Sequence, residues 1–458
     1  MNNQNVDIKA KIDALKEEKP WLELYEIEAI IAEETGIDVA NYLQNEPTDN
    51  KKGSNYSAIT ADVSGKYGAY EDDDDDDKPQ EIQQPAVEQP KVESVSPAEA
   101  ALQAEREAAK KAVEKRARKT IAKNINSEMS RVGFTLLLYV VLTLAACVGL
   151  SLFLVVLMGK DITEVSAFVS DPKFAAVFEG ALLFLGLALP FVFYIYINKL
   201  PVGDMVPLKK LRDGELLPMI FIGLGVVMLE GYAVNLLATD FDFTGANYSY
   251  NSVSLGTTFG EFIVSLLCLS LVPALVETFV FNGVILQVLR RRGGDGYALI
   301  MSAILHAILC ANFEDMIGAF VTSLVLGYLV IYSGSLVPAV IVRGIDLIIF
   351  LGITQLGFIV PSLDTVMLID MVISLGLIVA AIFSIMTMLK RFPNFFQIKK
   401  GDQYMTVGEK VRISLLRPTV LILAAYSVCF ALIQLFPIDE ILEFAEGKIY
   451  DIWVSMMR

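Results

Sequence analysis

Between Phe134 and Phe436 the sequence alternates long apolar runs with short polar connections, as membrane proteins with many spans do. A helix needs about 20 predominantly apolar residues to cross the hydrocarbon core of a bilayer. The runs of suitable length are 134–158, 174–197, 216–238, 259–286, 297–313, 316–332, 336–358, 367–389 and 419–436. The fifth and sixth runs are short, and only Glu314 and Asp315 separate them. The pattern therefore predicts an all-α fold, a polytopic transmembrane bundle of eight or nine spans.

A polar region precedes the first span. Residues 1–46 carry apolar positions at helical spacing and predict a short helical segment that docks a cytoplasmic protein partner. Residues 47–98 are acidic and rich in Asn, Ser, Gln and Pro, so we expect a disordered linker there. Residues 99–130 are rich in Ala, Glu, Lys and Arg and predict a charged juxtamembrane helix. The transmembrane bundle then occupies 131–436, and the tail 437–458 is interpreted as an interfacial helix or a frayed end.

The basic residues of the connections fall on alternate loops. Lys and Arg are concentrated before the first span and in the loops after the second, fourth and eighth spans. The loop 239–258 has no Lys or Arg at all. Because basic loops stay on the cytoplasmic side, this alternation predicts a multi-pass protein of the cell membrane. Its N-terminus is expected in the cytoplasm and its C-terminus outside.

The composition agrees with an acidic N-terminal region followed by an apolar membrane region. The 458 residues are 54% hydrophobic and 20% charged, with a mean hydropathy of +0.52 and a net charge of −16. Residues 1–100 hold 9 Lys and Arg against 24 Asp and Glu. This composition excludes a purely soluble protein and disfavours a nucleic-acid binder. The four cysteines lie in apolar runs without metal-binding spacing, so no disulfide framework is implied.

Ionisable side chains inside the spans are candidates for function, since their insertion costs several kcal/mol. They are Glu179, Glu230, Glu261, Glu277, His306, Arg343, Asp346 and Asp370. Glu179, Glu261 and Asp370 lie near the ends of their runs, where snorkelling is cheap. For Glu230, a structural hydrogen bond to a neighbouring helix is as good an interpretation as chemistry.

The remaining four groups carry more information. Arg343 and Asp346 are spaced i, i+3 and are expected to pair on one helix. A buried Arg requires an acid, and Glu277 and Asp346 are the obvious ones. His306, the single histidine of the chain, lies four residues before Cys310, so the two share a helical face.

These residues carry a resemblance. The stretch of about 266–347 resembles the core of the CPBP family, the CAAX-endopeptidase and bacteriocin-processing (Abi) intramembrane proteases. The family pattern is Glu-Glu-x-x-Phe-Arg-Gly, then Phe-x-x-x-His, then a His followed by an Asn about four residues on. Here the first motif reads Glu277-Thr278-Phe279-Val280-Phe281-Asn282-Gly283, and Asn312-Phe313 and the run 332–339 also match their family positions.

At the catalytic positions, this sequence departs from the family pattern. Thr278 replaces the second Glu and Asn282 replaces the Arg of the first motif. His306 stands at the Phe position, Cys310 at the first His and Arg343 at the second His. In the family, glutamates and histidines are thought to activate a water, directly or through a metal. Arg stays protonated and serves neither as a base nor as a metal ligand.

Two functional interpretations follow from the resemblance. In the first, the chain is a catalytically degenerate member in which Glu277, Arg343 and Asp346 form an ion-pair network. It binds a membrane peptide, a prenylated peptide or a partner helix within the lipid bilayer, and no metal or cofactor is expected. In the second, it is an active intramembrane endopeptidase of CAAX-like processing or bacteriocin self-immunity. Glu277 then acts as base with His306, or His306 activates Cys310 as a thiolate, and zinc becomes possible.

A third interpretation is a transporter-like helical bundle that resembles the proteases by accident. It predicts pseudo-symmetric halves with helices broken at matching positions. Pro190 and Pro273 lie within spans, but the sequence shows no convincing repeat.

Overall fold

The computed structural model describes residues 97–159, 168, 171–243, 258–311, 313–398, 401 and 404–435. The predictions for 1–46, for nearly all of 47–98 and for 437–458 therefore lie outside the described residues. Two compact units are distinguished, 1–120 and 121–458, and each is described by itself. In the first unit the described part is the start of a helix, where Ala109 and Val113 form a small buried cluster.

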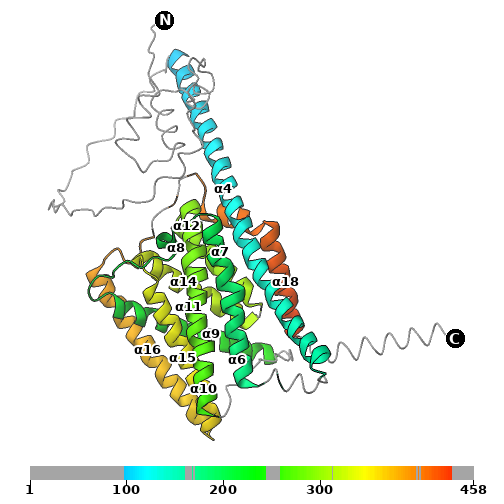
Figure 1. The fold of residues 1–458 in the computed structure, drawn as a ribbon. Helices are drawn as coiled ribbons and strands as arrows, with labels where there is room; N and C mark the ends of the chain where they lie inside the picture. Colours follow the sequence, from blue (N-terminus) through cyan, green and yellow to red (C-terminus); the bar gives the residue numbers. More distant parts are fainter. Residues whose placement is uncertain are drawn as a thin grey trace. The chain divides into compact units, whose positions relative to one another are not determined.

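The described residues are helical and contain no strand, which confirms the all-α class. An isolated antiparallel bridge joins Leu208 to Ser335. The helices, with π-helical segments marked η, are α4 (Pro97–Leu152), η2 (Phe153–Leu157), α6 (Pro172–Ala181), η3 (Leu182–Ala188), α7 (Leu189–Ile197), α8 (Val202–Met205), α9 (Leu216–Phe243), α10 (Phe259–Leu266), η4 (Leu267–Leu271), α11 (Val272–Glu277), η5 (Thr278–Ile285), α12 (Leu286–Gly293), α13 (Asp295–Cys310), α14 (Phe313–Ser333), α15 (Val337–Ile359), α16 (Leu363–Arg391), α17 (Val407–Leu415) and α18 (Pro418–Leu435) (Figure 1).

The described helices give seven candidate spans, or eight if the bent pair α17 and α18 counts as one. These two helices meet at 74°. The expected fifth span, 297–313, corresponds to α13, which has only 16 residues. At 1.5 Å per residue it reaches about 24 Å, less than the roughly 30 Å of a hydrocarbon core. The multi-span helical bundle is thus confirmed. With the bent pair counted, the described helices give one candidate span fewer than the nine apolar runs, because α13 is too short to be counted as a span.

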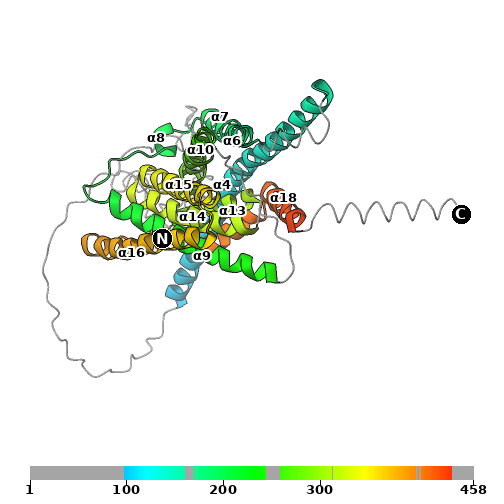
Figure 2. The same ribbon diagram turned by 90° about the horizontal axis from the view of Figure 1, so that it is seen from below.

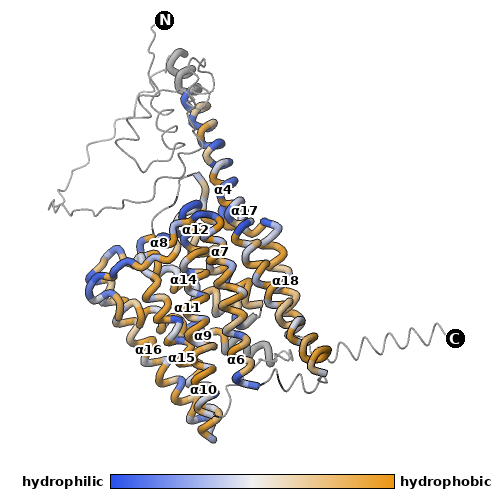
Figure 3. The backbone as a smooth tube through the Cα atoms, viewed as in Figure 1, coloured by the Kyte–Doolittle hydropathy of each residue, from blue (hydrophilic) through white to orange (hydrophobic). Residues whose placement is uncertain are grey.

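Apolar side chains cover the outside of the bundle, as expected for helices that face lipid. In α16, for example, Met367, Val372 and Phe383 are each more than 60% exposed. Figure 3 shows the spans as mostly hydrophobic tube, with hydrophilic stretches at their ends. The helices approach one another through small residues, because an added Cβ on Gly225 of α9 would lie 2.3 Å from Ala381 Cβ of α16. Figure 2 shows these two helices side by side from below.

The span Phe259–Gly293 is one long helix interrupted by two π-helical segments, η4 and η5. Pro273 explains the first, because its ring clashes with the carbonyl of Leu269, which lies in η4. In the same way Pro190 follows η3. The second segment, η5, begins at Thr278 and contains no proline. Such π segments frequently mark functional positions, and η5 follows Glu277 directly.

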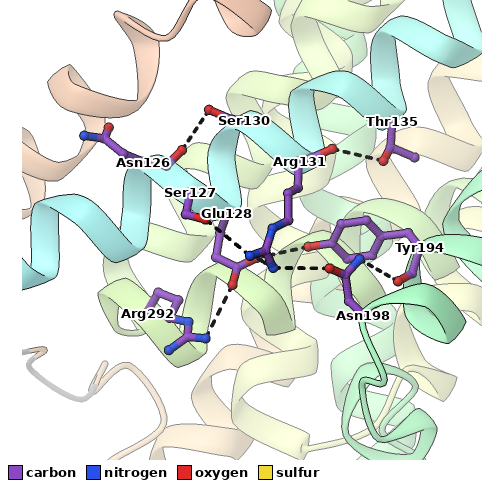
Figure 4. Close-up of polar contacts among 9 residues, drawn as sticks. All are labelled: Asn126, Ser127, Glu128, Ser130, Arg131, Thr135, Tyr194, Asn198 and Arg292. Carbon is purple, nitrogen blue, oxygen red and sulfur yellow. Dashed lines mark hydrogen bonds and ion pairs between the residues drawn. The ribbon is translucent and has the colours of Figure 1, made fainter. Parts of the chain in front are cut away.

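A polar junction joins α4, α7 and α12 at the end of the bundle that carries the arginines of α12. Glu128 of α4 is 7% exposed and accepts a hydrogen bond of 3.2 Å from the Tyr194 hydroxyl of α7. Its other carboxylate oxygen lies 3.4 Å from Arg292 Nη2 of α12. Arg131, one turn along α4, lies 3.6 Å from Glu128 and donates to Asn198 (Figure 4). The junction therefore connects α4 to the end of the long helix that carries Glu277.

Candidate functional site

The structure brings Glu277, Arg343 and Asp346 together. Arg343, two turns into α15, places Nε and Nη2 3.0 and 2.9 Å from Glu277 Oε2, at the end of α11. Its Nη1 donates to Asp346 Oδ2, one turn further along α15, over 2.9 Å. The side chains of the three residues are only 12–20% exposed. One guanidinium thus bridges two carboxylates in the interior of the bundle, and the three groups together keep one formal negative charge.

His306 lies beside this network on α13. Its Nε2 is 3.9 Å from Glu277 Oε2, and the side chain is 8% exposed. The ring stacks on Phe281 of η5, with centroids 4.1 Å apart and planes 17° apart. One turn before His306, the Ser302 hydroxyl donates to the carbonyl of Phe281 over 2.6 Å. Phe281 is the phenylalanine of the first motif, but the sequence did not indicate that it would contact His306 and Ser302.

Cys310 is the last residue of α13, and the next residue, Ala311, takes a left-handed conformation with φ of 53°. Cys310 interacts electrostatically with Glu277 and Arg343. It is four residues from His306 on the same helix, as the spacing required. Asn312 lies outside the described residues.

The two substituted motif positions of η5 are buried. Asn282 is 2% exposed and donates from Nδ2 to the Ser323 carbonyl of α14 over 3.1 Å. Gly327 makes room for this contact, because an added Cβ there would lie 3.3 Å from Asn282 Nδ2. Thr278 is fully buried, and its hydroxyl finds no hydrogen-bond partner among the described residues. The same is true of Ser323 Oγ and His306 Nδ1 within the described part of the chain.

Glu230 of α9 belongs to the same region. It interacts electrostatically with Asp346 and Arg343, and an added Cβ on Gly318 of α14 would lie 2.8 Å from its Oε1. From the sequence, a structural hydrogen bond and a chemical role were equally good interpretations of this residue. The structure places a further carboxylate close to a network that holds one arginine.

The other acidic residues of the spans lie at different places. Glu179 of α6 interacts electrostatically with Glu277. Glu261 completes a capping box with Thr258 at the start of α10 and lies 3.4 Å from Lys173. Asp370 lies two turns into α16 and is half-buried. Glu261 therefore has a structural role as a helix cap, as its place near the end of a run suggested.

The described residues do not fit a metal centre. No group of three His, Cys, Asp or Glu side chains that could hold a metal ion is found in the described ranges. The position between Glu277 and Asp346, where a cation is needed, is filled by the Arg343 guanidinium. Zinc in proteins takes thiolate, imidazole or carboxylate ligands, commonly four in number. We therefore assign no chemical step to a metal here.

The geometry leaves two chemical possibilities. Arg343 stays protonated, and its contact with Glu277 fixes α11 against α15. Glu277 could still accept a proton, and His306 is the group near enough to help it. The buried hydroxyls and the imidazole nitrogen without partners offer hydrogen bonds to a ligand backbone.

Residues 259–346 match a family model described as Rce1-like, type II CAAX prenyl endopeptidase Rce1-like. The match covers less than a fifth of the chain and contains Glu277, His306, Cys310, Arg343 and Asp346. It confirms the resemblance that the motifs predicted, over nearly the same residues. The comparison with curated proteins found no match, and neither did the comparison with solved structures.

Proposed function

We propose that this multi-span helical membrane protein, with its core of the CAAX-endopeptidase type, binds a peptide within the membrane and does not cleave it. The core resembles proteases of the CPBP family, and the match over 259–346 supports a related scaffold. The proposal concerns what the scaffold does in this chain. It holds a peptide segment, free or prenylated, at the position where a protease would cut it.

The observation that carries the proposal is the ion pair between Glu277 and Arg343. A general base must accept a proton from a water molecule in the transition state. Two guanidinium nitrogens lie within 3.0 Å of one oxygen of Glu277, so Arg343 already occupies the side of the carboxylate that a water molecule would have to approach. Arg343 also occupies the family position of the second histidine, so the site loses a base or ligand as it gains a fixed positive charge.

Peptide binding is supported by the buried polar atoms near the network. Thr278 Oγ1, Ser323 Oγ and His306 Nδ1 lack hydrogen-bond partners among the described residues, and each such buried group costs about 1–3 kcal/mol. An unwound peptide in a membrane needs hydrogen bonds for its own backbone. A short extended segment beside η5 would satisfy both sets of groups at once.

A cleavage assay on the purified full-length chain tests the absence of activity. Libraries of prenylated and unprenylated peptides are incubated with the protein in detergent, beside Glu277→Ala, and products are read by mass spectrometry. We expect no cleavage by either protein and no stoichiometric zinc. Cleavage by the wild type that disappears in Glu277→Ala overturns the proposal.

Binding is tested separately, with photo-crosslinking peptides from the same libraries. We expect Thr278→Val to weaken crosslinking several-fold while the unfolding temperature stays unchanged or rises, because the substitution removes a buried hydroxyl without a partner. Thr354→Val is the matched control, three turns along α15 from Arg343, where the hydroxyl donates to its own helix. Equal crosslinking by all three proteins contradicts peptide binding at this site.

One contact favours a second candidate, an active endopeptidase. His306 Nε2 lies 3.9 Å from Glu277 Oε2, so a small shift would form the hydrogen bond that a Glu–His pair needs. In this case His306→Gln and Glu277→Ala both abolish cleavage, whereas a Cys310→Ser variant separates thiolate chemistry from water activation. The acidic residues 1–98 keep their predicted role as a tethered site for a cytoplasmic partner in either case.

A further inference from the structure

A group of basic side chains lies where α9 begins and where α14 and α16 end. We name Lys209, Lys210, Arg212, Lys390 and Arg391 the basic rim. The first three lie in the loop between α8 and α9, and the last two end α16. All five lie within five residues of a helix end, and all five are exposed. Figure 3 shows hydrophilic stretches at this end of the bundle.

The loop that carries three of these residues is held in place by the backbone. Lys209 N donates to the Gly334 carbonyl over 3.3 Å, and Leu336 N donates to the Pro207 carbonyl over 2.8 Å. The Lys209 stem also packs on Gly334, because an added Cβ there would lie 3.0 Å from Lys209 Cδ. The basic side chains of this loop thus start from a backbone that is fixed to the connection between α14 and α15.

The end of α16 meets the same loop. An added Cβ on Gly214 would lie 2.9 Å from Arg391 Nη1. The Arg212 guanidinium lies 5.5 Å from the centre of the Phe392 ring, directly after α16. Segments almost 180 residues apart in the sequence therefore bring their positive charges to one place.

Most of this charge has no ion-pair partner in the part of the chain that the structure describes. The acidic residues of the two segments 206–215 and 388–398 are Asp213 and Glu215. Glu215 is 4% exposed and lies 4.0 Å from Arg212, while it also accepts from the Arg212 backbone and the Tyr332 hydroxyl. Among the described residues, no ion pair involves the other four members of the basic rim. The rim thus keeps an excess of positive charge.

Exposed apolar side chains surround the rim. Leu208 is 67% exposed, Phe396 is 56% exposed and Leu389 is 42% exposed. Phe396 packs edge-on against the buried Phe395, with centroids 4.9 Å apart, so its outward position is fixed. The candidate span of α16 ends at Arg391, which places the rim at the boundary between hydrocarbon and water.

We propose that the basic rim binds the headgroup of an anionic phospholipid, whose acyl chains lie along Leu208, Leu389 and Phe396. Lysine and arginine clusters at the end of membrane helices attract anionic headgroups, each charge contributing about fivefold in affinity near the surface. The partner needs both a negative phosphate and an apolar tail, because exposed basic and exposed apolar side chains are neighbours in the same two segments. The proposal does not depend on peptide binding at Glu277.

The test uses the purified full-length chain and phosphatidylglycerol in mixed micelles with phosphatidylcholine. Native mass spectrometry counts the retained phosphatidylglycerol for the wild type and for the triple variant Lys209→Gln, Lys210→Gln, Arg391→Gln. The matched control, Lys115→Gln, Lys119→Gln, Lys123→Gln, removes the same charge from exposed positions of α4. We expect retention to fall at least about tenfold in the rim variant and less than twofold in the control.

Two outcomes would overturn the proposal. Equal loss in the rim and control variants would show that only net charge attracts the lipid. Equal competition by glycerol phosphate and by phosphatidylglycerol would show that the apolar contacts add nothing and that the partner is not a lipid. A Phe396→Ala variant, which keeps all basic residues, is expected to lose retention several-fold, and unfolding temperatures without lipid confirm that each variant is folded.

Discussion

Arg343 links two carboxylates in the interior of the bundle. Its guanidinium contacts Glu277 on one side and Asp346 on the other, and all three side chains are largely buried. Transfer of a charge from water into such a place costs several kcal/mol unless a partner with good geometry compensates it. The bridge meets this condition for both carboxylates at once, so removal of the arginine is worse than removal of either acid.

The first prediction concerns this bridge. Arg343→Met leaves two buried carboxylates without a counter-charge, and we expect it to destabilise the protein by about 3–5 kcal/mol. The double variant Arg343→Met, Glu277→Gln removes one of these charges and is expected to recover part of the loss. Thermal unfolding in detergent measures both. A double variant that is less stable than Arg343→Met would show that the two groups do not interact.

Among the helices, α9 and α16 approach each other closely at a glycine. An added Cβ on Gly225 would lie 2.3 Å from Ala381 Cβ and 3.0 Å from the Leu377 carbonyl. Helices in a membrane associate through small residues, because the surrounding lipid is as apolar as the side chains. The contact therefore depends on the absence of a side chain at Gly225, not on burial of a large one.

The second prediction follows from this contact. Gly225→Ala forces the two backbones apart and is expected to cost about 1–3 kcal/mol. Gly231→Ala is the control on the same helix, where an added Cβ meets nothing within 4 Å. We expect it to be neutral or to stabilise by up to about 1 kcal/mol, since alanine has the higher helix propensity. Unfolding temperatures that fall equally in both variants would contradict the packing argument.

The polar junction at Glu128 joins three helices and lies outside the candidate functional site. Its carboxylate contacts Tyr194 of α7, Arg292 of α12 and Arg131 of α4. The arginine side chains are about half exposed, so solvent weakens these ion pairs, whereas the hydrogen bond to Tyr194 is buried. The junction thus stabilises the meeting of three helices mainly through a buried carboxylate.

The third prediction separates this carboxylate from an ordinary surface acid. We expect Glu128→Gln to destabilise by about 1–2 kcal/mol, because a charged hydrogen-bond acceptor becomes neutral. Glu114→Gln, on the same helix, removes an exposed pair with Arg118 and is expected to cost less than about 0.5 kcal/mol. The two unfolding curves are compared in low and high salt, and a cost for Glu128→Gln that vanishes in high salt would assign it to the exposed arginines.

For the molecule as a whole, the basic connections lie at one end of the bundle. The ion pair of Arg291 with Asp204 joins two of these connections, and backbone contacts join 207–209 to the connection 334–336. The positive-inside rule predicts that this end faces the cytoplasm. The connection between α15 and α16, at Ser362 and Asp364, then belongs to the opposite end.

The fourth prediction tests this orientation in intact cells. A membrane-impermeant maleimide is expected to label Asp364→Cys and to leave Lys210→Cys unlabelled until the cells are opened. The parent chain is the control, since its four cysteines lie in apolar helices. The reverse labelling pattern would contradict the predicted side of the N-terminus.

The spans were predictable because apolar runs of about 20 residues have few other uses. The α13 segment was the exception. Its apolar run 297–313 continues across the end of the helix at Cys310, where Ala311 takes a left-handed conformation that hydropathy does not reveal. The motif region was also visible, since Glu277 keeps the first glutamate of the family pattern, and the family match covers the same stretch. For Arg343 and Asp346, local spacing was enough to predict the pair.

Contacts between helices depend on how each helix is rotated about its axis and how deep it lies in the membrane. A run of apolar residues specifies neither. The sequence named Glu277 as a partner for Arg343, but only packing of α11 on α15 puts them within 3.0 Å across 66 residues. Nothing local indicated that His306 stacks on Phe281, that Glu128 meets Arg292 or that Lys209 and Arg391 share one rim. Hydropathy and charge thus determined which segments enter the membrane, whereas side-chain packing between distant helices determined which polar groups meet there.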